Sequence, residues 1–113
     1  MSSYRVDREK WAQLDILEQM GNISSEVGRA ISATRAGKAK RADGAVDRAL
    51  DLFDATIDTL AAEKSHRLKE VLRAREEFAR LFFDGTFETD ADALERYFNH
   101  FAVAARNSAQ HDV

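Results

Sequence analysis

Residues 46–60 read VDRALDLFDATIDTL, and this stretch decides the fold class. Its apolar side chains recur at intervals of three and four residues, which places them along one side of an α-helix. They are Val46, Ala49, Leu50, Phe53, Ile57 and Leu60. Asp43 precedes them and is a favourable N-cap residue. The pattern therefore predicts an amphipathic helix over residues 43–63.

The same spacing continues toward the N-terminus and predicts a first helix over residues 7–35, with Asp7 as its N-cap. Its apolar face comprises Leu14, Ile16, Leu17, Met20, Ile23, Val27, Ile31 and Thr34. Gly21, Ser24 and Gly28 line one edge of this face, where small side chains would let a neighbouring helix approach closely. The alternative is a helix break at Gly21-Asn22. Residues 35–44 hold two glycines and no large apolar side chain, so they are expected to form a loop.

Two further helices are predicted toward the C-terminus. Residues 65–83 place Leu68, Val71, Leu72, Phe78, Ala79 and Phe82 on one face, and Asp84-Gly85 ends this helix. Thr89, with Asp92 three residues later, is the expected N-cap of a helix over residues 89–106. Its inner face carries Leu94, Tyr97, Phe98, Phe101 and Ala105, with the Tyr97 hydroxyl at the rim. Residues 107–113 are expected to be a disordered tail.

The boundary near Ser65 determines the architecture. Residues 61–66 contain neither Gly nor Pro, and Ser65 is an acceptable N-cap. Without a turn there, one helix over residues 43–83 would extend about 61 Å and would need a partner chain to cover its apolar side. Four helices within one chain are the simpler solution. The prediction is an all-α protein, an antiparallel (up-down) four-helix bundle forming a single domain over residues 1–113.

Composition limits the function classes. The 113 residues include 44% hydrophobic side chains, enough for a core of ordinary domain size. The absence of cysteine excludes disulfides, a thiolate zinc site and a cysteine nucleophile. The first ten residues contain no apolar run, and no stretch is long enough to cross a bilayer. The expectations are a cytoplasmic location, no membrane association and no cofactor.

Charge is distributed in blocks along the chain, although the formal net charge is only −3. No acidic residue occurs between Glu26 and Asp43, and five basic residues fall in that interval: Arg29, Arg35, Lys38, Lys40 and Arg41. One interpretation is that oppositely charged neighbouring elements select one helix order. The other is a binding site for phosphates or an acidic partner. No aromatic residue is interleaved to stack on bases.

No metal site is expected. Carboxylates at the spacing of Asp47, Asp51, Asp54 and Asp58 could collect a divalent cation. They lie on the outer side of their helix, whereas a bundle metal site requires inward-facing ligands, so the prediction is a solvated stripe. Glu63-Lys64-Ser65-His66 matches half of a di-iron bundle motif, which requires two inward-facing copies. The three histidines, at positions 66, 100 and 111, lack the spacing of a zinc protease helix.

Arg75 is unusual because helical projection places it in the middle of an apolar face. An unpaired guanidinium would be costly to bury, so Arg75 is expected to pair with a carboxylate across the seam or to extend from the end of the bundle. The alternatives are an anion-binding or catalytic role, or a position in an oligomer interface.

Arg96 and His100 lie one helical turn apart, in the sequence Arg96-Tyr97-Phe98-Asn99-His100. An arginine and a histidine together could stabilise charge and move a proton on RNA. In its four-helix architecture the chain resembles the HEPN superfamily, and it is also similar to other small bacterial helical-bundle proteins. Some HEPN members are ribonucleases with an Arg-x4-6-His motif, whereas here only three residues separate Arg96 from His100. The resemblance implies an RNA-binding or RNA-cleaving module.

Trp11, Leu52 and Val103 are all placed off the apolar faces of their helices and could form a self-association surface. The sequence therefore favours a non-enzymatic protein that acts by protein–protein association, most commonly as a homo-oligomer. The alternative is a HEPN-like RNA-binding or ribonuclease module. It would use Arg35, Lys38, Lys40 and Arg41 for phosphates, and Arg96 with His100 for chemistry.

Overall fold

The computed structural model describes residues 6–111, and every regular element in that range is a helix. The five helices are α1 (Arg8–Ala12), α2 (Ile16–Arg35), α3 (Ala39–Ala62), α4 (Leu68–Phe83) and α5 (Phe87–His111). Four of them are long, and the all-helical class predicted from the sequence is confirmed. None of the helices in the described range is both long and apolar enough to cross a membrane.

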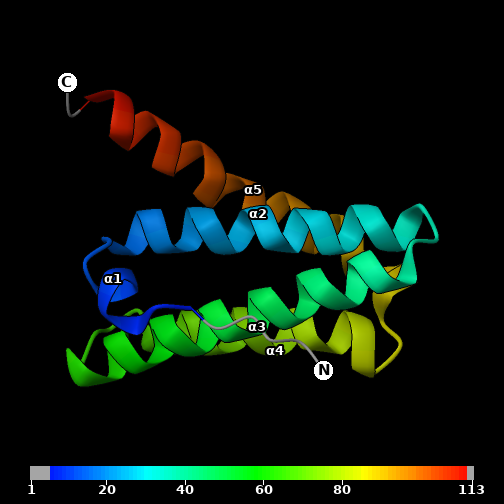
Figure 1. Cartoon of the computed structure of the whole chain (residues 1–113), viewed down its shortest axis with the longest axis horizontal. Coiled ribbons are helices and arrows are strands. Elements are labelled where there is room, and N and C mark those ends of the chain that lie inside the picture. The colour runs from blue at the N-terminus through cyan, green and yellow to red at the C-terminus, as the bar shows by residue number, and fades with distance from the viewer. Residues whose placement is uncertain (1–5, 112–113) are drawn as a thin grey trace.

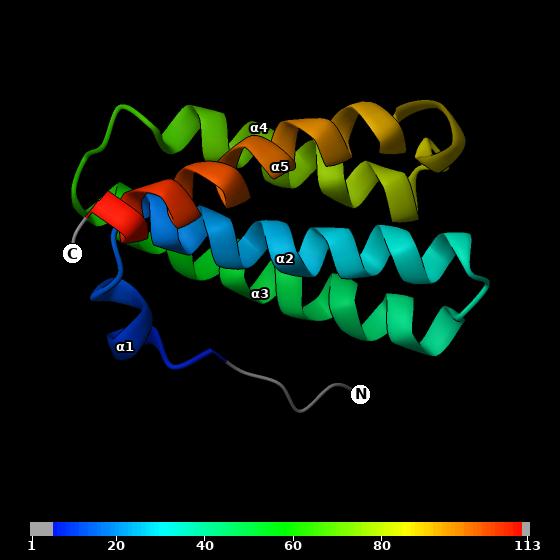
Figure 2. The ribbon, with the colours of Figure 1, turned by 90° about the horizontal axis from the view of Figure 1, so that it is seen from above.

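Each long helix packs against two others. α2 contacts α3 and α5, and α4 contacts the same two helices. Successive long helices run in opposite directions (Figure 1), and the view from above shows α4 beside α5 and α2 beside α3 (Figure 2). The core between them is continuous and includes three phenylalanines from three helices. The Phe53 ring lies 6.0 Å from that of Phe78 and 5.8 Å from that of Phe98.

The predicted single helix over residues 7–35 is wrong, because the chain breaks between Ala12 and Ile16. Asp7 does cap α1, accepting from the amides of Glu9 and Lys10. A second start follows at Asp15, which forms a capping box with Glu18: the Glu18 amide donates to Asp15 Oδ1 at 2.8 Å. The break turns α1 toward α3, which it contacts.

This turn buries Trp11, which the sequence placed on the surface. Its side chain is 6% exposed, and its indole Nε1 donates to Thr56 Oγ1 at 2.9 Å. Leu52 was also predicted to be exposed, but it is 4% exposed and belongs to the same core cluster as Trp11. Only Val103, which is 40% exposed, lies where the sequence placed it. The three residues therefore do not form one surface.

Small residues on α2 have two different roles. A Cβ built on Gly21 would lie 2.8 Å from the Ala105 Cβ, so α5 approaches α2 closely there, as predicted. A Cβ on Gly28 would meet nothing within 4 Å, so the predicted close approach is wrong at that position. The alternative break at Gly21-Asn22 is also wrong, since α2 is continuous through both residues.

The loop predicted over residues 35–44 contains only residues 36–38. Gly37 adopts a left-handed conformation, with φ of 71°, that closes α2. The chain then enters α3 at Ala39, because Ala-Lys-Arg-Ala is a run of strong helix formers. Asp43 is therefore inside the helix and is not its N-cap. Lys38 occupies that position and makes no side-chain capping hydrogen bond.

A turn does separate α3 from α4, so the alternative of one helix over residues 43–83 is wrong. Lys64 takes the left-handed conformation (φ 54°), and Ser65 Oγ accepts from the Arg67 amide at 3.1 Å. α4 begins at Leu68, three residues later than predicted. Gly85, with φ of 73°, follows α4 as predicted.

The last helix is longer than predicted at both ends. α5 begins at Phe87, because the Thr86 carbonyl accepts from the Asp90 amide at 2.9 Å, so Thr89 is not the N-cap. The helix continues to His111, where a disordered tail was predicted from residue 107; residues 112 and 113 lie outside the described range. Beyond its contact with Gly21, α5 diverges from α2 (Figure 1).

Candidate functional sites

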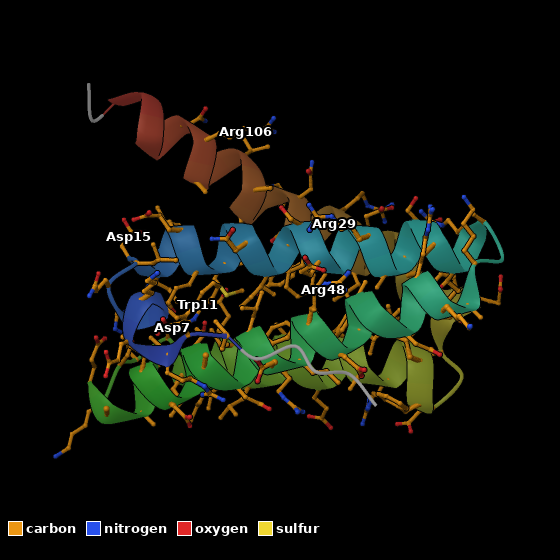
Figure 3. All side chains as sticks on the ribbon, in the orientation of Figure 1. Asp7, Trp11, Asp15, Arg29, Arg48 and Arg106 are labelled. Atoms are coloured by element: carbon orange, nitrogen blue, oxygen red, sulfur yellow. The ribbon has the colours of Figure 1, made fainter. Side chains whose placement is uncertain are left out.

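A groove between α2 and α3 gathers much of the predicted basic cluster. Its volume is about 740 Å³. α2 contributes Ser25, Gly28, Arg29, Ser32, Ala33 and Ala36, and the start of α3 with its N-cap contributes Lys38, Lys40, Arg41, Gly44 and Arg48. Five of these lining residues are cationic and none is acidic. Figure 3 shows Arg29 on α2 and Arg48 on α3 near each other on the same side of the molecule. We call this feature the basic groove.

The carboxylate of Glu26 pairs with both Arg29 and Arg48. Glu26 accepts from Arg29 Nη1 at 2.5 Å and from Arg48 Nε at 2.9 Å, and its side chain is 12% exposed. The single negative charge of Glu26 thus neutralises part of the positive charge of Arg29 on α2 and Arg48 on α3. For Lys38, Lys40 and Arg41, no ion pair is found within the described residues.

Arg35 was predicted to join this cluster but points elsewhere. Its guanidinium contacts the carboxylates of Asp92 and Glu95 on α5, with Nη1 2.9 Å from Glu95 Oε1. The hydrogen bond to Glu95, aided by the charges of nearby acids, raises the pKa of Arg35. Arg35 therefore links α2 to α5, which agrees with the interpretation that opposite charges attract neighbouring elements.

Arg75 has the partner across the seam that the sequence favoured. Its Nε donates to Asp54 Oδ1 at 2.8 Å, which joins α4 to α3. Asp54 belongs to the aspartate stripe predicted to be solvated, and two other members are also engaged. Asp51 Oδ2 accepts from the Val6 amide at 2.7 Å, and Asp58 Oδ2 accepts from Arg8 Nη1 at 2.7 Å. Asp51 and Asp58 attach the segment around α1 to α3. The solvated interpretation is correct for Asp47 and Asp58, which are exposed, whereas Asp51 and Asp54 are partly buried.

Arg96 and His100 are both exposed on α5 and lie one turn apart. Within the described part of the chain, neither residue lines the basic groove or any of four further hollows. The structure does not bring them together with the basic groove or with a third catalytic group. Among the described residues, no group of three potential metal ligands converges.

Tyr97 lies at the rim of the core, as the sequence indicated. Its hydroxyl donates to Glu70 Oε1 at 2.9 Å, which connects α5 to α4. Partial burial of the phenol, together with this hydrogen bond and the Glu70 charge, raises the pKa of Tyr97 above its usual value.

The outer side of α3 and α4 carries an apolar face. Leu72 is 44% exposed and Phe83 is 68% exposed. Neither residue was recognised as a surface group from the sequence, which placed Leu72 in the core. The partly buried Leu50, Ile57, Leu68 and Ala79 accompany them. We call these six residues the outer apolar face. Beside Phe83 lies a hollow of about 560 Å³, lined by apolar Ala42 and Val46 and by charged Lys38, Asp43 and Asp47.

Sequence reasoning missed Arg48 as a lining residue of the groove, and Glu26 as the carboxylate that pairs with Arg29 and Arg48. Gly44 and Arg48 follow Arg41 at intervals of three and four, so the three share one side of a helix. That signal becomes readable only when the helix is started at Ala39 instead of Asp43.

No family model, curated protein or solved structure was found to match this chain. The interpretation of both surfaces therefore depends on their own geometry.

Proposed function

We propose that the four long helices form an antiparallel bundle whose function is protein association, and that its partner is a second copy of the chain. The outer apolar face is the contact surface. The observation that carries this proposal is the exposure of Leu72 and Phe83 on one line of α4.

Helical geometry supports a continuous surface. Leu72 and Phe83 are eleven residues apart, which is three turns, about 16 Å, with an angular offset of only about 20°. Leu68 and Ala79 lie on the same line and are partly buried. Isolated apolar side chains on a surface are ordinary, whereas an aligned set bordering a second helix is typical of an interaction surface.

The face is self-complementary, which favours a second copy over an unrelated partner. Two α4 helices packed antiparallel about a two-fold axis near residues 77 and 78 would set Leu72 of each copy opposite Phe83 of the other. The hollow beside Phe83 could then receive the Leu72 side chain of the second copy. One chain thus supplies both the protruding group and the space that accepts it.

The ion pair at the centre of this face is compatible with burial. Arg75 is the cation closest to the centre of the apolar line, and Asp54 already neutralises it at 2.8 Å. A dimer would bury this pair intact, which avoids the cost of desolvating an unpaired guanidinium.

Sedimentation velocity across a concentration series tests the proposal. The wild-type protein is expected to form a dimer, and Leu72→Glu is expected to weaken association by about 100-fold, because a carboxylate would be buried in an apolar contact. Val103→Glu is the matched control, since Val103 is similarly exposed at 40% but lies on α5. Circular dichroism checks that both variants fold. A wild-type protein that stays monomeric at its highest soluble concentration contradicts the proposal, as does equal weakening by both variants.

A further inference from the structure

The basic groove lies mostly apart from the proposed dimer contact. Arg48 and Leu50 are two residues apart on α3, a rotation of about 200°, so the groove and the outer apolar face lie on opposite sides of that helix. Lys38 lines both the groove and the hollow beside Phe83, so a dimer formed through the apolar face leaves the other four groove cations open.

The charge on the groove exceeds what the protein itself neutralises. Lys38, Lys40 and Arg41 are exposed, and within the described residues no carboxylate lies within ion-pair distance of them. Arg29 and Arg48 share the single charge of Glu26. The chain as a whole carries a formal net charge of −3, so the local charge of the groove is opposite in sign to the net charge of the protein.

The floor of the groove consists of small residues from both helices. Gly28 and Gly44 lie on it together with serines and alanines of α2, and a Cβ at Gly28 would extend into open space. None of the lining residues is large and apolar, and none is aromatic. The groove therefore attracts negative charge without providing a pocket for an apolar anchor or a platform on which a base could stack.

We propose that the basic groove binds the phosphate backbone of a nucleic acid, independently of base sequence. On α2 the lining runs from Ser25 to Ala36, about 16 Å, which is long enough to meet more than one phosphate, since the axial spacing along one strand of a duplex is roughly 3.4 Å. Cations on both helices can thus contact successive phosphates. Backbone contacts of this kind position a strand without reading bases, which agrees with the absence of aromatic and apolar lining residues.

The surroundings favour a narrow strand over other anionic partners. Asp43 and Asp47 line the neighbouring hollow and would repel a broad anionic surface such as a membrane. An acidic protein segment commonly adds apolar anchors to its charge, and the groove has no place for them. A phosphate backbone needs only the charge and the depth that the groove provides.

Fluorescence anisotropy with labelled single-stranded RNA, single-stranded DNA and duplex DNA tests the proposal over a range of salt concentrations. Three unpaired cations predict a slope of about −2 for log K against log salt on single strands. Gly28→Glu is expected to bind at least about 10-fold more weakly than Gly28→Gln. These two side chains have the same size, and both replace glycine within a helix by a better helix former, so they differ mainly in charge.

A charge-matched pair provides the second test. Replacing Lys38, Lys40 and Arg41 together by alanine is expected to lower affinity by about 100-fold, since each phosphate contact releases counterions. Replacing Lys10, Lys69 and Arg73 by alanine makes the same change in net charge at exposed positions away from the groove and should leave most of the affinity. Equal losses in the two triple variants overturn the proposal. So do the absence of binding to any of the three nucleic acids at low salt and equally tight binding of poly-glutamate.

Discussion

The two sides of α3 differ in what they lack. Toward α2, Arg41, Gly44 and Arg48 border a groove that has charge but no large apolar side chain. Toward the outer side of α4, Leu50 and Ile57 border a face that has apolar side chains and one neutralised ion pair. A single helix therefore presents an anion-attracting surface and an apolar surface, separated by about half a turn.

The comparison shows how each surface arises. On the groove side, small residues of α2 and α3 leave space between the helices, and long cationic side chains border that space. On the other side, the apolar arc of α4 is wider than the area that α3 and α5 cover, so Leu72 and Phe83 remain exposed. Substitutions that affect both the basic groove and the outer apolar face, only one of them, or neither can separate anion binding from self-association.

The largest effect is expected from Phe53→Ala, which removes the core that both sides share. Phe53 is fully buried and lies between Phe78 and Phe98. Its truncation should lower the free energy of unfolding by about 3–5 kcal/mol. Urea denaturation followed by circular dichroism measures this change. Leu50→Ala, at a partly buried position, should cost clearly less, and a loss at Phe53 no larger than at Leu50 would contradict the assignment of this core.

Glu26→Gln acts on the groove side alone. The substitution keeps the size of the side chain but releases Arg29 and Arg48 from a carboxylate, so affinity for single-stranded RNA should rise by about 5-fold, equivalent to about 1 kcal/mol. Anisotropy at fixed salt measures this effect. Glu88→Gln, an exposed position on α5, is the control. Unchanged or weaker binding by Glu26→Gln would show that the two arginines do not contact the ligand.

Asp54→Asn acts on the apolar side alone. It leaves Arg75 without its carboxylate, so burying the guanidinium in a dimer becomes less favourable and the dissociation constant should rise by about 3-fold. Sedimentation velocity measures the change. Asp58→Asn removes an ion pair with Arg8 instead and should leave association unaltered. A similar shift in both variants would indicate a general charge effect.

Tyr97→Phe acts on neither side and is expected to have the smallest effect, about 0.5 kcal/mol from the hydrogen bond to Glu70. The folded-state pKa of Tyr97 is raised above the unfolded value of 10.0, because burial and Glu70 both disfavour the phenolate. Its contribution to stability is therefore complete below about pH 10 and is lost as the pH rises above that value. The urea midpoint of the wild type should exceed that of Tyr97→Phe below pH 10, and the difference should shrink and then reverse as the pH rises above 10, because the phenol ionises more readily in the unfolded chain. A constant difference would exclude the linkage.

Several elements could be predicted from local signals. The apolar periodicity of residues 46–60 identified a helix, Gly85 ended another, and Ser65 marked the turn that separates α3 from α4. The break before α2 also had a local signal, the capping box Asp15-Ile16-Leu17-Glu18, which was overlooked because the apolar spacing continues across it. The start of α3 was misplaced because Asp43 is a good cap, although the preceding residues are good helix formers.

The sequence by itself determined the helical content and the approximate inner side of most helices, because periodicity is a property of neighbouring residues. The tertiary structure decided which flanking side chains are covered. Trp11 and Leu52 are buried because α1 turns across α3, whereas Leu72 and Phe83 stay exposed because no described helix covers that side of α4. The basic groove likewise combines side chains of two helices. Such outcomes depend on how helices that are distant in sequence pack together, and a local sequence pattern does not specify that packing.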